Sequence, residues 1–107
     1  MSGSFGDMGN LLKQAQHMQR ELDRVREELR STTVEGTAGG NAVRVEVTGD
    51  RRVTKVEISQ EAIAAGDKEV LEDLILAALR DGMGRAQKLA EESMGNVTGG
   101  MQLPGLF

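Results

Sequence analysis

The most regular pattern in the sequence is an unbroken heptad of apolar residues between Met8 and Arg30. The apolar positions alternate in spacing between three and four residues, and they are Met8, Leu11, Ala15, Met18, Leu22, Val25 and Leu29. This spacing places the side chains on one stripe of an α-helix, the stripe that packs along a second helix. The sequence therefore predicts a long N-terminal helix that has a helical partner.

Two segments in the middle of the chain alternate apolar and polar residues, as half-buried β-strands do. They are residues 42–48 and 53–58, with Val43, Val45 and Val47 on one face of the first and Thr54, Val56 and Ile58 on one face of the second. The β-branched run Ser31–Glu35 predicts a shorter strand before them, and the glycines of Gly36–Asn41 predict a loop. Together these segments predict a three-stranded antiparallel sheet.

The register of the second and third strands follows from their charges. A loop of four residues, Gly49–Arg52, sets Arg44 opposite Glu57 and Glu46 opposite Lys55. A loop of two residues, Gly49-Asp50, would instead set Arg44 opposite Lys55. Opposite charges across a ladder stabilise by roughly 0.2–1 kcal/mol each and like charges destabilise, so the longer loop is predicted. In that register Arg44 and Lys55 are neutralised, whereas Arg51 and Arg52 stand unpaired at a turn.

A second long helix is predicted in the C-terminal half. Ser59–Ala65 has the pattern of one helical turn that ends at Gly66, and Asp67 is a candidate cap for a helix running to about Met94. Its first half is apolar nearly all round, so it should lie between the sheet and another layer. Gly82 and Gly84 indicate a weak point, a bend or a close backbone approach in this helix.

These elements predict one α+β domain over residues 1–107, with two layers: a long N-terminal helix, a three-stranded antiparallel sheet and a long C-terminal helix. Residues 1–7 and 96–107 are predicted to be flexible tails. Only two aromatic residues are present, so a chain of 107 residues can build only a modest core. The apolar helix surfaces therefore predict a homodimer. Its expected interface residues are Leu11, Met18, Leu22, Leu71, Leu74 and Leu79.

The residues that carry most enzyme and metal chemistry are scarce. The chain has no cysteine and one histidine, and its carboxylates are not clustered at ligand spacing, so we expect no metal site, no cofactor and no catalytic set. No apolar run reaches the ~20 residues that span a bilayer, and no signal-peptide pattern opens the chain. We therefore expect a cytoplasmic protein that has no membrane or small-molecule partner and is not an enzyme.

Charge is distributed unevenly along the chain. The net charge is −4, yet residues 1–55 hold 9 Lys/Arg against 8 Asp/Glu, whereas residues 56–107 hold 4 against 9. Local patches rather than the total set the field at a surface, so a polyanionic partner is compatible with this chain. The candidate contacts lie on the helix side opposite the heptad and at the predicted turn: Lys13, Arg20, Arg24, Arg51 and Arg52, with Arg26 and Arg30 as further candidates.

Two functions are compatible with this pattern. The first is binding of double-stranded DNA mainly through backbone phosphates, since exposed aromatics for stacking on single strands are missing. The second is a helical module that assembles with a protein partner and contacts DNA weakly or indirectly. The apolar helices and the acidic total favour the second function, and the basic residues of the first half favour the first.

Four segments in order carry a resemblance to a known family: GNLLKQAQHMQRELDRVREEL, VRVEVTGDRRVTKVEI, DKEVLEDLILAAL and GGMQLPG. The sequence resembles the YbaB/EbfC family of bacterial nucleoid-associated proteins over nearly its whole length. The resemblance implies a homodimer with projecting helices that binds double-stranded DNA in the nucleoid and changes its conformation or compaction, with effects on gene expression and DNA protection. The chain departs from the family pattern at Ser59-Gln60, where the family usually has Asp-Pro, and at Gly82 and Gly84.

Overall fold

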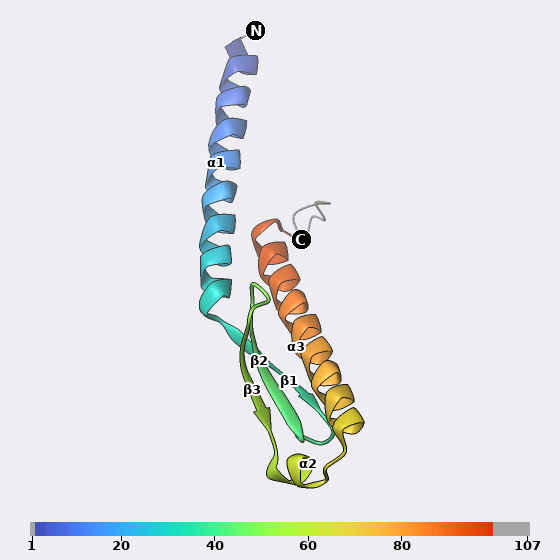
Figure 1. Cartoon of the computed structure of the whole chain (residues 1–107). Helices are drawn as coiled ribbons and strands as arrows, with labels where there is room; N and C mark the ends of the chain where they lie inside the picture. Colours follow the sequence, from blue (N-terminus) through green and yellow to red (C-terminus); the bar gives the residue numbers. More distant parts are fainter. Residues whose placement is uncertain (1, 100–107) are drawn as a thin grey trace.

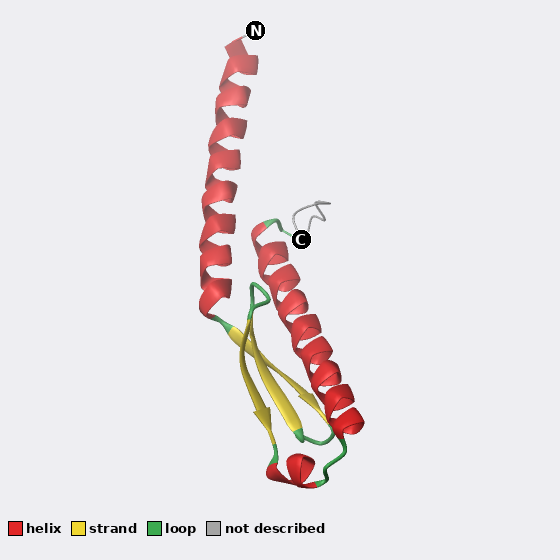
Figure 2. Ribbon diagram, in the orientation of Figure 1, coloured by secondary structure: helices red, strands yellow, loops and turns green. Residues whose placement is uncertain are grey.

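The protein is elongated, measuring 76 × 21 × 16 Å, in a computed structural model that describes the backbone of residues 2–99. Its elements are α1 (Ser2–Ser31), β1 (Thr33–Ala38), β2 (Val43–Thr48), β3 (Val53–Ile58), α2 (Gln60–Ala64) and α3 (Lys68–Val97). The strands form an antiparallel sheet in the order β1-β2-β3, and α3 lies along one face of it (Figures 1 and 2). α1 leaves the end of the sheet and extends well past the end of α3 (Figure 1). The predicted α+β fold is confirmed.

Both long helices extend further than the sequence pattern indicates. α1 begins at Ser2 rather than Met8, so residues 2–7 are helical, and the flexibility predicted for them stays a prediction. Glycines lower helix propensity but do not end a helix that the following residues have already nucleated. At the other end α3 continues to Val97, and the N–H of Thr98 donates to the carbonyl of Met94. The rest of the predicted C-terminal tail, residues 100–107, lies outside the described residues.

The predicted register of the β2–β3 hairpin is confirmed. Val43 pairs with Ile58, Arg44 with Glu57, Val45 with Val56 and Glu46 with Lys55, and the turn spans the four residues between Thr48 and Val53. One detail differs: a bulge makes Thr54 the extra residue, so Val53 rather than Thr54 lies opposite Val47 and shares its face. Thr54 instead donates through Oγ1 to Glu46 Oε2 at 2.8 Å.

β1 is longer than predicted, and a glycine within it lets α3 approach the sheet closely. Gly36 pairs with Val45 inside the strand, so the loop predicted over Gly36–Asn41 is only the turn after Ala38. A Cβ on Gly36 would lie under 3.0 Å from the backbone nitrogen of Gly82, and one on Gly82 would lie 2.7 Å from Val47 Cγ2. Gly82 therefore marks a close approach of α3 to the sheet.

Two hydrophobic clusters hold the chain together. The larger joins α3 to the sheet and consists of the buried residues Val43, Val45, Val47, Ala78 and Ala86. The smaller joins α1 to the end of α3 and consists of Leu22, Val25, Leu29 and Met94. The partner of the heptad is therefore the chain's own α3, but only over the second half of α1. In the first half Met8 and Leu11 are 65% and 64% exposed.

A carboxylate fixes α3 to the edge strand. Asp81 Oδ2 accepts the backbone N–H of Thr37 at 2.9 Å, and Oδ1 accepts Arg85 Nε at 3.2 Å. The hydrogen bond from Thr37, followed by that from Arg85, holds the pKa of Asp81 below its usual range.

No helix among residues 2–99 is long and apolar enough to cross a membrane.

Candidate nucleic-acid interface

The outer face of α1 carries three of the predicted contacts, and they differ in how free they are. Lys13, Arg20 and Arg24 are all exposed, and no ion pair joins Lys13 or Arg20 to another described residue. Arg24 instead contacts Glu21 at 2.8 Å and Glu28 at 2.6 Å. The hydrogen bond between Arg24 and Glu21 lowers the pKa of Glu21 and raises the pKa of Arg24. Lys13 and Arg20 are therefore the available cations on this face.

An open groove of about 830 Å³ lies beside these residues, between α1 and the end of α3. Lys13, His17 and Arg24 line it from α1, and Ser93 and Asn96 line it from α3. Glu21 and Glu28 lie on the same wall, so cations and anions alternate along the groove. Of the two available cations of α1, Lys13 lines this groove and Arg20 does not.

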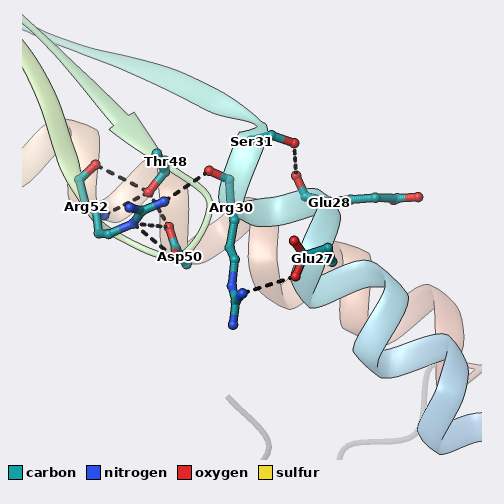
Figure 3. Close-up of polar contacts among 7 residues, drawn as sticks. All are labelled: Glu27, Glu28, Arg30, Ser31, Thr48, Asp50 and Arg52. Carbon is teal, nitrogen blue, oxygen red and sulfur yellow. Dashed lines mark hydrogen bonds and ion pairs between the residues drawn. The ribbon is translucent and has the colours of Figure 1, made fainter.

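The β2–β3 turn holds one free arginine and one bound one. The prediction that Arg52 is unpaired was wrong, because its Nε donates to Asp50 Oδ1 and Oδ2 at 3.2 and 3.1 Å and its Nη2 donates to the carbonyl of Arg30 at 3.3 Å (Figure 3). The sequence shows the acidic neighbour two residues away but not the helix end that the turn contacts. Arg51 adopts φ 66°, and no ion pair joins it to any residue of the described chain.

The outer face of the sheet is neutralised largely as predicted. Arg44 contacts Glu57 across the ladder and lies 3.6 Å from Glu35 on β1. Lys55 contacts Glu57 at 2.7 Å on its own strand, so the expected ion pair with Glu46 does not form. The bulge gives Glu46 the hydroxyl of Thr54 as its partner instead. The charges of Arg44 and Lys55 are therefore neutralised by carboxylates of the sheet itself.

The sequence matches known proteins along nearly its whole length. The model of the YbaB/EbfC DNA-binding family matches residues 5–101. The chain belongs to this family. A relative in Pelotomaculum thermopropionicum is 43% identical over 102 residues, covering 95% of this chain and 97% of the relative, and one in Chloroflexus aurantiacus is 48% identical over 97 residues, covering 91% and 95%. Both relatives are named nucleoid-associated proteins.

The fold is shared with a solved crystal structure. The crystal structure of an uncharacterized protein from Helicobacter pylori superposes with a TM-score of 0.70, covering 88% of this chain and 96% of that one. At 23% identity this likeness concerns the fold alone.

Within this YbaB/EbfC chain the structure brings the two further candidates, Arg26 and Arg30, close to Arg51. Arg26 and Arg30 lie on the flank of α1 that faces the β2–β3 turn, and they line a common hollow with Arg51. The sequence places them four residues apart on one helix face, but only the docking of the turn against α1 brings Arg51 to them.

Among the described residues no group of three or more His, Cys, Asp or Glu side chains is arranged to hold a metal ion.

Proposed function

We propose that this chain is a nucleoid-associated protein that binds double-stranded DNA mainly through phosphate contacts. The observation that carries the proposal is the set of exposed cations, Lys13, Arg20 and Arg51, that have no ion pair within the described chain although the protein is acidic overall. Membership of a DNA-binding family and the names of the relatives support it. Arg24 and Arg52 are secondary members, because carboxylates offset their charges.

The spacing on α1 suits a duplex. Lys13 and Arg20 are seven residues apart, which is about 10 Å along a helix. This distance is close to the ~12 Å width of the major groove, so the two side chains can contact phosphates on its two edges. Phosphate contacts carry no sequence information, and no aromatic residue lies between Phe5 and Phe107 to stack on bases. We therefore expect weak sequence preference.

The proposal is tested by a gel shift with the purified protein at low salt. Two duplexes of unrelated sequence should bind with similar affinity, and single strands of the same length should bind more weakly. A protein that binds neither duplex would not act on DNA directly. The alternative, a helical module for a protein partner, would then account for its exposed apolar surface.

A homodimer is part of this proposal, because much apolar surface is uncovered in one chain. Among the residues whose side chains the structure describes, the large apolar ones that are at least 40% exposed are Met8, Leu11, Leu12, Val53, Val56, Ile63, Val70 and Leu76. Among the predicted interface residues, Leu11 remains open, Met18 is partly buried, and Leu71, Leu74 and Leu79 are partly buried against the sheet cluster. Leu22 is only 5% exposed and is covered by the chain's own α3. A stable, hydrophobic dimer interface buries about 2,000 Å² or more in total.

Two leucine substitutions separate dimerisation from folding. Leu76→Asp, on a side chain that is 47% exposed, should leave the helical circular dichroism intact and yield a monomer in sedimentation velocity at micromolar concentration. Leu22→Asp should unfold the protein, because it places an unpaired charge inside the cluster that joins α1 to α3. A wild-type protein that sediments as a folded monomer would refute the dimer.

The dimer also gives a route to DNA compaction. A two-fold axis duplicates every cation of one chain, so each dimer presents two sets of phosphate contacts. Where the two sets face different duplexes, one dimer can bridge them. We propose that changes in DNA conformation and any effect on gene expression or DNA protection follow from this bridging.

A further inference from the structure

Three parts of the chain enclose a hollow of about 290 Å³ at the end of α1. α1 contributes Arg26 and Arg30, the β2–β3 turn contributes Arg51, and α3 closes the side with Gln87 and Glu91. We call Arg26, Arg30 and Arg51 the arginine hollow. The hollow lies on a different side of α1 from Lys13 and Arg20, because Arg26 lies toward the heptad stripe and those two residues lie opposite it.

The turn is fixed against α1 by contacts that leave Arg51 free. The N–H of Gly49 donates to the carbonyl of Thr32 at 2.8 Å. A Cβ on Gly49 would lie 2.6 Å from Leu29 Cδ2 and 2.9 Å from Leu29 O, so a side chain at this position would push the turn away from the helix. Arg52 adds a link from Asp50 to the last turn of α1 (Figure 3). The turn therefore presents Arg51 beside the arginines of α1.

Arg52 is well suited to this linking role. Its guanidinium donates to a carbonyl at the C-terminal end of α1, where the helix dipole favours a cation. Its backbone N–H donates to Thr48 Oγ1 at 2.9 Å, and Thr48 in turn contacts Asp50. Arg52 is thus held by three neighbours and is a positioning residue for Arg51.

The ion pairs of the other two arginines are weak. Arg26 lies 3.3 Å from Asp23 and Arg30 lies 3.1 Å from Glu27, and all four side chains are at least 44% exposed. Exposed pairs of this kind contribute about 0–1 kcal/mol, so a phosphate can displace either carboxylate.

The carboxylates that line the hollow already have hydrogen-bond donors. Asp50 accepts from Thr48 and Arg52, and these bonds, with that from Thr48 the larger cause, hold the pKa of Asp50 below its usual range. Glu91 accepts Gln87 Nε2 at 3.1 Å. Neither carboxylate forms an ion pair with Arg26, Arg30 or Arg51 in the described chain. The hollow therefore retains cationic donors for an external anion.

We infer that the arginine hollow binds a phosphate group of the DNA backbone. The inference rests on the proposed function and adds a second contact region to it. A guanidinium presents a planar fork of donors that matches phosphate oxygens, so three of them from two elements can surround one phosphate or two neighbouring ones. A duplex bound in this way contacts both the outer face of α1 and its joint with the sheet.

The sharpest test is a gain of binding, which misfolding cannot imitate. Glu91→Gln removes a negative charge from the wall of the hollow and should raise the affinity for a duplex about two- to fivefold at low salt, the range expected for one exposed charge interaction. The matched control is Glu69→Gln, in the first turn of α3, which changes the net charge equally at the other end of that helix. The control should change the affinity by much less.

Removing the arginines supplies the second measurement. Arg51→Gln should make the slope of log K against log[salt] less negative by about 1 per protomer. Arg52→Gln should weaken binding to a similar extent by releasing the turn, and the double variant should be no weaker than Arg51→Gln alone, because both changes remove the same contact. A positioning role predicts this lack of additivity.

The two proposals fail in distinguishable ways. If Glu91→Gln behaves like Glu69→Gln and Arg51→Gln keeps the wild-type slope while Lys13 and Arg20 variants lose affinity, the hollow is not a phosphate site but the proposed function stands. If the wild-type protein binds no duplex, both proposals are wrong. Additive losses from Arg51→Gln and Arg52→Gln would contradict the positioning role of Arg52.

Discussion

The variant Lys13→Glu/Arg20→Glu should lose duplex affinity by at least about tenfold at low salt, because each protomer then loses two phosphate contacts and gains two repulsive charges. The loss should be similar for unrelated DNA sequences, since these contacts read no bases. The slope of log K against log[salt] should become less negative by about 2 per protomer. Fluorescence anisotropy with labelled duplexes measures both quantities. The fold should remain intact, because both side chains are exposed and neither belongs to a hydrophobic cluster.

The control for this prediction is a variant with the same net charge. Arg80→Glu/Lys88→Glu reverses two cations on α3, and the described chain gives neither an ion pair. It should lose markedly less affinity than the α1 variant. Equal losses would show that total charge rather than the α1 surface governs binding. If the α1 variant binds as well as wild type, this face of α1 is a solvated surface that does not contact DNA.

The largest effect on stability is expected from Gly36→Ala. The new methyl group would lie under 3.0 Å from the backbone of Gly82 and of Ala78, and backbone atoms cannot move aside as a flexible side chain can. Separating α3 from β1 to make room would also weaken the cluster around Val45. We expect a loss of about 3 kcal/mol or more, a large part of the ~5–15 kcal/mol that holds a small domain folded. Urea unfolding at a fixed protomer concentration measures it.

Gly84→Ala is the matched control. Apart from the neighbouring backbone of its own helix, a Cβ at this position meets no atom within 4 Å, and Gly84 lies within α3 only two residues from Gly82. The same substitution should therefore stabilise the protein by up to about 1 kcal/mol through helix propensity. A Gly36→Ala variant as stable as wild type would contradict the close approach of α3 to β1.

Local rules were sufficient for the hairpin and the N-terminal cap of α3. The charges of Arg44 and Glu57 select one register, and the structure has that register. Asp67 caps α3 by accepting the N–H of Val70, as side chains of this type do. Such features depend on neighbours in sequence or across one ladder, so the sequence alone predicts them.

Features that depend on tertiary contacts were not predictable in the same way. The heptad indicates a helical partner, but its periodicity does not distinguish a second chain from α3, which covers Leu22 and Val25. The state of Arg52 depends on a carbonyl 22 residues away, at Arg30. For the same reason the sequence names Arg26 and Arg30 only as further candidates, because their grouping with Arg51 depends on the docking of the turn against α1.

The most direct test of DNA binding through phosphates is a salt titration of the wild-type protein with one random duplex. The account predicts a linear fall of log K with log[salt], with a slope of about −0.9 for each neutralised phosphate. Three to five contacts in each protomer of a dimer then correspond to a slope of roughly −5 to −9, nearly the same for a second, unrelated duplex. A slope near zero, or no binding at low salt, would contradict the account.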